Sequence, residues 1–132
     1  MNQPYRDLIV EGGPKHDEMR LGAPHGAVTE IRFRDHRLVD AAHLTQVGQQ
    51  LLSIAADAPQ KSRFVLSFDG VEAMSSAALG IIIAFDDEVR RKYGVLHLSD
   101  LKDDLLKLFT LTKLNKRLHI YASADEARAE FT

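Results

Sequence analysis

The spacing of hydrophobic residues along this 132-residue chain switches between two periods, which predicts alternating strands and helices. Short apolar or alternating runs indicate β-strands. We expect strands at residues 28–33, 63–68, 95–98 and 118–121, and a short additional strand at residues 8–10. In the first of the four main runs, the alternation places Ile31 and Phe33 on the inward face of the sheet.

Apolar residues spaced three and four positions apart predict helices between these strands. The first helix is expected from an N-cap at Asp40 to about residue 56. Its apolar stripe consists of Leu44, Val47, Leu51 and Ile54. The second is expected from Ser76 to about residue 92, with Gly94 as a left-handed terminator.

Two further helices are indicated by capping patterns near the C-terminus. Asp100 and Asp103 resemble a capping pair that opens a helix. The apolar residues of this helix are Leu105, Leu106, Leu108 and Phe109. Ser123 and Glu126 form an S-x-x-E capping box for a final short helix ending near Phe131.

This order of elements predicts an α/β fold in a single domain. Right-handed crossovers make most of the sheet parallel, so we expect a mixed sheet of four to five strands covered by about four helices. Residues 28–132 form this domain. Residues 1–27 are expected to be an N-terminal arm that can contribute an edge strand, because glycine and proline punctuate most of it.

Composition excludes several classes of function. The net charge of −2, from 17 basic and 19 acidic residues, offers no excess of cations for nucleic acid. There are no cysteines, so disulfides and thiolate sites are excluded. No apolar run approaches the length of a membrane span and no signal sequence is visible, so we expect a cytoplasmic protein without a membrane partner.

No catalytic or metal-binding motif is apparent. The six histidines have no acidic companion at metal-ligand spacing, so we expect neither metal nor cofactor. A hydrolase built on Ser75 would need flanking glycines, but Ala73 and Ala78 occupy those positions. There is no Walker loop or G-x-G-x-x-G run. We therefore expect a binding protein and not an enzyme.

The most informative stretch is a strand, an acidic turn at Asp69–Gly70 and two serines, Ser75 and Ser76, that precede an apolar helix. A hydroxyl at this junction can cap the free N–H groups of the first helical turn. It can also accept a phosphate, whose charge suits a helix N-terminus. From these residues alone, a cap at Ser76 and a turn role for Asp69 are the simpler interpretations, and the phosphoacceptor role stays open.

Residues 65–71 and 75–80 resemble the STAS domain of bacterial anti-sigma-factor antagonists, and residues 111–116, 120–121 and 125–127 follow the pattern of its C-terminal third. The resemblance extends from about residue 28 to the end. The usual motif of that family is Asp-Ser-Ser/Thr-Gly-Leu-Gly, with the first hydroxyl residue after the Asp as phosphoacceptor. When the motif is aligned on Leu79–Gly80, the acceptor is Ser76. Ser75 then replaces the Asp and is a second candidate, and Ala78 replaces a glycine.

The resemblance implies partner switching: the unphosphorylated protein binds an anti-sigma factor that is also a serine kinase, and phosphorylation of Ser76 releases it. A phosphatase would reverse the step, and the domain is expected to be a monomer or a weak homodimer. The residues expected to contact the partner are Asp69, Met74, Ser75, Ser76, Ala77, Leu79 and Gly80. The alternative is a STAS domain without phosphorylation, acting as a scaffold or interaction subunit in a signalling or transport assembly.

Overall fold

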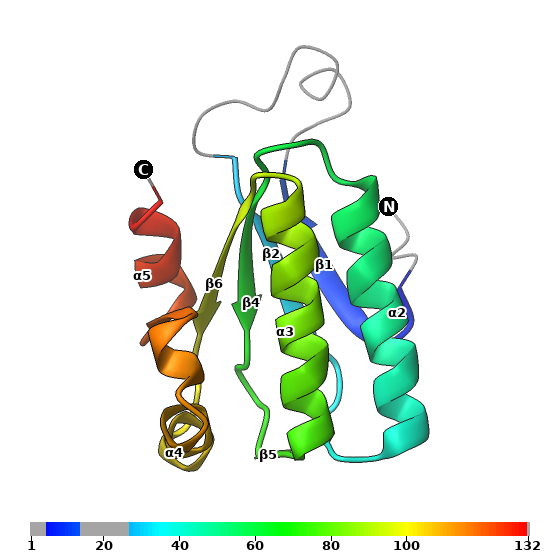
Figure 1. The fold of residues 1–132 in the computed structure, drawn as a ribbon, viewed down its shortest axis with the longest axis vertical. Coiled ribbons are helices and arrows are strands. Elements are labelled where there is room, and N and C mark those ends of the chain that lie inside the picture. Colours follow the sequence, from blue (N-terminus) through cyan, green and yellow to red (C-terminus); the bar gives the residue numbers. More distant parts are fainter. Residues whose placement is uncertain (1–4, 14–26, 132) are drawn as a thin grey trace.

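The computed structural model describes residues 5–13 and 27–131, which form a five-stranded sheet with helices on both faces (Figure 1). The strands of this sheet are β1 (Leu8–Gly12), β2 (Thr29–Phe33), β4 (Arg63–Ser67), β6 (Val95–Ser99) and β7 (His119–Tyr121). A separate two-stranded sheet joins β3 (Arg37–Leu38) to β5 (Ala73–Met74). The helices are α2 (Ala41–Asp57), α3 (Ser76–Arg91), α4 (Asp103–Leu111), α5 (Ala124–Ala129) and the short 3-10 helix η1 (Leu114–Lys116).

The sheet is mixed and mostly parallel, as the sequence predicts. Its strand order is β1-β2-β4-β6-β7; β1 is antiparallel to β2 and the remaining pairs are parallel. The edge strand expected at residues 8–10 is therefore confirmed. The rest of the predicted arm, residues 1–4 and 14–26, lies outside the described residues.

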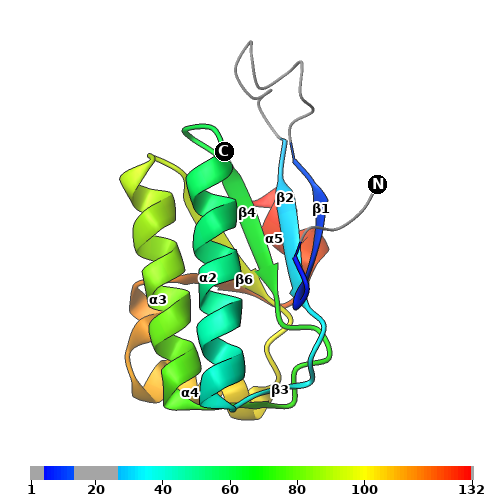
Figure 2. The same cartoon turned by 90° about the vertical axis from the view of Figure 1, so that its right-hand side faces the viewer.

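Helices α2 and α3 pack side by side on one face of the sheet, and α5 lies on the other face (Figure 2). The face toward α2 and α3 is apolar, with one row of neighbouring strand residues formed by Val10, Ile31, Leu66, Leu98 and Ile120. Ile31 and Phe33 are both buried, as predicted. Phe68 contacts Phe33 and Phe109, whose ring centroids lie 5.2 and 6.3 Å away, so this core continues to α4.

Two of the predicted helix starts have the expected caps. The Oδ2 atom of Asp40 accepts a hydrogen bond of 2.9 Å from the backbone N–H of His43 at the start of α2. All four predicted stripe residues of α2 are buried. The Ser123 hydroxyl accepts from the backbone N–H of Glu126 at 3.1 Å and begins α5.

The predicted role of Gly94 is wrong. Tyr93, not Gly94, adopts the left-handed conformation after α3, with φ of 62°. Gly94 instead lies against the backbone: a Cβ atom there would come within 2.6 Å of the Ser62 carbonyl oxygen. The glycine is required by this close approach.

The predicted capping pair of Asp100 and Asp103 is also wrong, because α4 begins at Asp103 and Lys102 is its N-cap residue. Asp100 instead bonds to residues of two neighbouring strands. Its Oδ2 atom accepts hydrogen bonds from the hydroxyls of Ser67 and Ser99, at 3.0 and 2.6 Å. The carboxylate thereby joins the C-terminal ends of β4 and β6, and its backbone is left-handed, with φ of 64°.

Lys92 connects the C-terminal ends of α2 and α3. Its ammonium group donates to the carbonyl oxygens of Ala55 and Ala56, at 3.2 and 2.8 Å, and to that of Ala58. These carbonyls lie at the end of α2, where the helix dipole favours a cation.

Within residues 5–13 and 27–131, none of the helices has the length and apolar character needed to cross a bilayer.

Candidate functional site

The Ser75–Ser76 junction lies at the N-terminus of α3, and a small strand pair that the sequence does not predict determines its position. Strand β5 ends directly before Ser75 and pairs with β3. The backbone N–H of Ser75 donates to the carbonyl oxygen of Leu38 at 3.0 Å. The carbonyl oxygen of His36 accepts from the N–H of Glu72 at 2.7 Å. We call residues 69–76 the Ser76 turn; its backbone is fastened to the segment of residues 36–38.

The two serines differ in exposure. Ser75 is the N-cap residue and Ser76 is the first helical residue, so the prediction that Ser76 caps the helix is wrong. Ser75 makes no side-chain capping bond, and its Oγ atom is buried without a hydrogen-bond partner among the described residues. Ser76 is exposed. A protein kinase could therefore reach the hydroxyl of Ser76 but not that of Ser75 in this conformation.

The other residues expected to contact a partner do not all lie at the surface. Asp69, Ala77 and Gly80 are exposed, and Met74 is partly buried against the core. Leu79 is only 5% exposed and belongs to the core cluster. Its side chain is therefore not available at the surface, because the inner face of α3 packs on the sheet.

A shallow, mainly apolar groove between α2 and α3 begins beside Ser76. Its volume is about 440 Å³. Its lining residues are Ala41, Leu44, Thr45, Gly48, Gln49 and Leu52 of α2 and Ala77, Gly80, Ile81 and Ala84 of α3. The small residues of α3 at three- and four-residue spacing are visible in the sequence. The contribution of α2 was missed, because it depends on how two helices distant in sequence pack together.

Gly80 and Gly48 both lie in this groove but have different surroundings. A Cβ atom on Gly48 would lie 3.3 Å from Cγ1 of Ile81, so its absence lets α2 and α3 pack closely. A Cβ atom on Gly80 would meet nothing within 4 Å. The fold itself therefore does not need a glycine at position 80.

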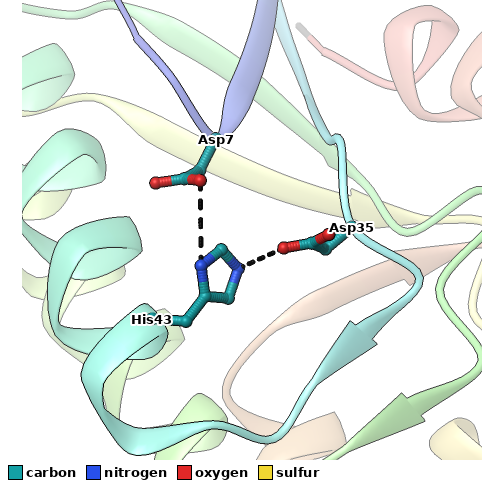
Figure 3. Close-up of side chains that lie close together, drawn as sticks. All are labelled: Asp7, Asp35 and His43. Carbon is teal, nitrogen blue, oxygen red and sulfur yellow. Dashed lines mark ion pairs between the residues drawn. The ribbon is translucent and has the colours of Figure 1, made fainter.

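A second group of polar side chains consists of Asp7, Asp35 and His43 (Figure 3). The Nε2 atom of His43 lies 2.7 Å from Oδ2 of Asp35, and its Nδ1 atom lies 3.7 Å from Oδ1 of Asp7. No histidine has an acidic residue at metal-ligand spacing in the sequence, yet the fold brings two carboxylates to His43. Its two partners come from different segments of the chain, so linear spacing does not reveal them.

The geometry of this carboxylate–histidine cluster is that of a double ion pair. Its two carboxylates lie at opposite nitrogens of one imidazole ring (Figure 3). A metal ion would bond to only one ring nitrogen and would need both carboxylates on that side. In this arrangement His43 makes one close contact, to Asp35, and one longer contact, to Asp7.

The comparisons with known proteins agree with this fold. The family model described as STAS domain matches residues 25–127. An anti-sigma-factor antagonist (STAS) domain protein from Planctomyces limnophilus has a TM-score of 0.71 at 15% sequence identity, covering 91% of this chain and 95% of that chain.

Two further solved structures show how widely the fold is shared. The Bacillus cell fate determinant SpoIIAA in its phosphorylated form has a TM-score of 0.56 at 18% identity, covering 76% of this chain and 86% of that chain. A sulfate transporter family protein from Wolinella succinogenes has a TM-score of 0.63 at 17% identity, covering 80% of this chain and 84% of that chain. No curated protein matches the chain significantly. These structural likenesses concern the fold, and the match over residues 25–127 shows that the chain belongs to the STAS domain family.

Proposed function

We propose that this STAS domain is an anti-sigma-factor antagonist that acts by partner switching, with Ser76 as its phosphorylated residue. In this proposal the unphosphorylated domain binds an anti-sigma factor with serine kinase activity, and a phosphatase restores the binding form. In this proposal the protein works by binding and not by catalysis, and it acts in the cytoplasm.

The observation that carries the proposal is the contrast between an exposed Ser76 and a buried Ser75 hydroxyl at the start of α3. The same end of α3 opens onto the apolar groove lined by Ala77 and Gly80. A kinase that phosphorylates Ser76 would thus modify the rim of a surface suited to protein contact.

Phosphorylation at this position is expected to change the surface and not the fold. A phosphate adds about −1.5 to −2 charges and three acceptor oxygens. The free N–H groups and dipole at the N-terminus of α3 favour an anion, so the domain tolerates it. A partner seated over Ala77 and Gly80 would instead meet a bulky, hydrated dianion next to apolar contacts.

Phosphopeptide mass spectrometry of the protein from its native cells, in growth and under stress, tests this proposal. Trypsin should release residues 64–90, whose hydroxyl side chains are Ser67, Ser75 and Ser76. We expect condition-dependent phosphate on Ser76. Phosphate on Ser75 would show that Ser75, and not Ser76, is the phosphorylated residue. An unmodified peptide in every condition would contradict the proposal.

Binding of the kinase that labels Ser76 provides the second test. Ser76→Ala should keep the affinity, whereas Ser76→Asp should lower it at least tenfold, because the carboxylate places a charge at the rim of the groove. Ser53→Asp adds the same charge to an exposed position of α2 that does not line this groove, and should bind like the wild type. Equal affinities for all three variants would contradict partner switching.

The same fold in a sulfate transporter family protein supports a second candidate, an unphosphorylated interaction subunit of a signalling or transport assembly. Under this alternative Ser76 stays unmodified, and Ser76→Asp affects binding no more than Ser53→Asp.

A further inference from the structure

The carboxylate–histidine cluster lies near the same end of the molecule as Ser76. His43 is in the first turn of α2, and the first turns of α2 and α3 lie together at one end of the helix layer (Figure 1). The cluster is separate from the groove, since none of its three residues lines it. We propose that His43 is a positioning residue for the Ser76 turn and acts through Asp35.

A short path of backbone contacts leads from Asp35 to Ser75. Asp35 is followed directly by the segment to which the Ser76 turn is fastened. His36 contributes its carbonyl oxygen to Glu72 and Ala73 and its Nδ1 atom to a 2.9 Å contact with the Gly70 carbonyl oxygen. Leu38 contributes its carbonyl oxygen to the N–H of Ser75. An ion pair that holds Asp35 therefore holds the backbone acceptors that place the Ser76 turn.

Asp7, on the other side of His43, is fixed to α2. Asp7 makes two hydrogen bonds with Gln50 of α2: its N–H donates to Oε1 at 3.0 Å and its Oδ2 accepts from Nε2 at 2.7 Å. The Asp7 side chain is only 11% exposed and that of His43 is 17% exposed, whereas Asp35 is 58% exposed. Asp35 is thus the movable member of the cluster, and His43 determines where it lies.

His43 lies among several charged and titratable groups. A protonated imidazole has an N–H group on both nitrogens and can serve both carboxylates, whereas a neutral ring has one N–H. Other charged groups near the cluster are Arg6, whose Nε lies 3.8 Å from Asp7 Oδ1, and Asp40, whose carboxylate caps the backbone of His43. Arg34 and His36 flank Asp35 in the sequence. The 2.7 Å contact between Nε2 of His43 and Oδ2 of Asp35 is the shorter of the two contacts that the ring makes, so loss of either side chain should loosen the segment that follows Asp35.

Amide hydrogen exchange on the isolated, unphosphorylated protein tests this inference. After correction for the intrinsic rates, His43→Gln and Asp35→Asn should each lower the protection of the Ser75 amide about fivefold, which corresponds to the loss of an ion pair of roughly 1 kcal/mol. His119→Gln removes an exposed histidine from β7, at the edge of the sheet opposite to β1, and should keep the wild-type profile.

Asp35→Asn keeps the experiment informative if His43→Gln disturbs α2, because Asp35 is exposed. Unchanged protection of Ser75 in Asp35→Asn would overturn the inference, and so would an equal loss at amides throughout the sheet. The relevance of this positioning to signalling rests on the proposed role of Ser76. The exchange measurement needs no partner, so a failure of partner switching and a failure of this coupling are distinguished.

Discussion

The two faces of the sheet are covered in different ways. The face under α2 and α3 is apolar, and two helices of 17 and 16 residues cover it. The opposite face is covered by α5, which has six residues. On that face one row of neighbouring strand residues reads Glu30, Val65, His97 and His119.

The face under α5 is held by polar contacts. Arg128 of α5 forms an ion pair with Glu30, which is only 9% exposed. The Nδ1–H of His97 donates to the Ala127 carbonyl oxygen at 3.0 Å, and its ring stacks on Phe131 with centroids 3.8 Å apart. One face is therefore packed by apolar side chains, whereas the other combines the buried Val65 and Ala127 with charged and titratable groups.

The largest effect should come from the apolar face. Phe85 of α3 is fully buried and its ring centroid lies 5.5 Å from that of Phe64. Phe85→Ala should lower the free energy of unfolding by about 3–5 kcal/mol, because it removes apolar contacts and leaves a cavity. Urea denaturation measures this. Leu111→Ala at a side chain that is 81% exposed should cost less than about 0.5 kcal/mol. Comparable losses in both variants would contradict the assignment of the core.

On the α5 face, Arg128→Ala should cost about 2 kcal/mol, because it leaves the buried Glu30 carboxylate without its main partner. Urea denaturation of a double variant with Glu30→Gln should recover part of this loss. Asp125→Asn removes the other, fully solvated partner of Arg128 and should cost less than about 0.5 kcal/mol. If the double variant were no more stable than Arg128→Ala, the unpaired Glu30 carboxylate would not be the cause of the lost stability.

A smaller, pH-dependent effect is expected at His97. Burial lowers the pKa of His97, a nearby His119 lowers it further, and the bond to Ala127 and the charge of Glu130 oppose the shift. The unfolded chain, with a histidine pKa of about 6.5, therefore takes up the proton more readily than the folded protein. The contribution of His97 to stability is complete above about pH 6.5 and is lost as the pH falls through its folded-state pKa.

Melting temperatures between pH 7 and pH 5 measure this effect. The wild type should lose stability on acidification, and His97→Gln should lose less than the wild type over the same range. His119→Gln, at an exposed position, should leave most of the slope unchanged. If the melting temperatures of the wild type and His97→Gln fell equally with pH, protonation of His97 would not be the cause of the acid-induced loss of stability.

The smallest effect compares two glycines in the helices of the apolar face. Gly80→Ala should raise the free energy of unfolding by about 0.5–1 kcal/mol, because alanine favours the helix and its Cβ meets open space. Gly48→Ala should raise the free energy of unfolding by less, because its Cβ atom would lie only 3.3 Å from Cγ1 of Ile81. Denaturation measures both. If Gly80→Ala also weakens binding of the kinase, Gly80 belongs to the partner surface; a destabilised Gly80→Ala would contradict the open space above it.

Much of the fold could be predicted from the sequence, because strands and long helices repeat a period over many residues. The stripe of α2, the inward positions of β2 and the box at Ser123 are such local signals. Features determined by tertiary contact could not be predicted. Strands β3 and β5 have two residues each and show no period, yet their pairing holds the backbone directly before α3, where the N–H of Ser75 donates to the Leu38 carbonyl oxygen.

In the candidate site, too, residues close in sequence could be predicted, whereas contacts between distant segments could not. The sequence identified Ser75 and Ser76 and the small residues of α3, since they lie within a few positions of each other. It did not indicate which hydroxyl is buried, nor the α2 side of the groove. It also did not indicate the meeting of Asp7, Asp35 and His43, which depends on the pairing of β1 with β2 and the packing of α2.

The link made by Lys92 has a consequence for motion. α2 and α3 run in the same direction, and Lys92 joins their C-terminal ends, whereas Ser76 lies at the other end (Figure 1). If the two helices move relative to each other, Lys92 is the expected pivot and the displacement should be largest beside Ser76. The chain has no cysteine, so pairs of cysteines can be introduced at chosen positions and spin-labelled without background labelling. Distance distributions between α2 and α3 should be broader near Ala41 and Ala77 than near Ala56 and Arg91, and equal widths would exclude such a hinge.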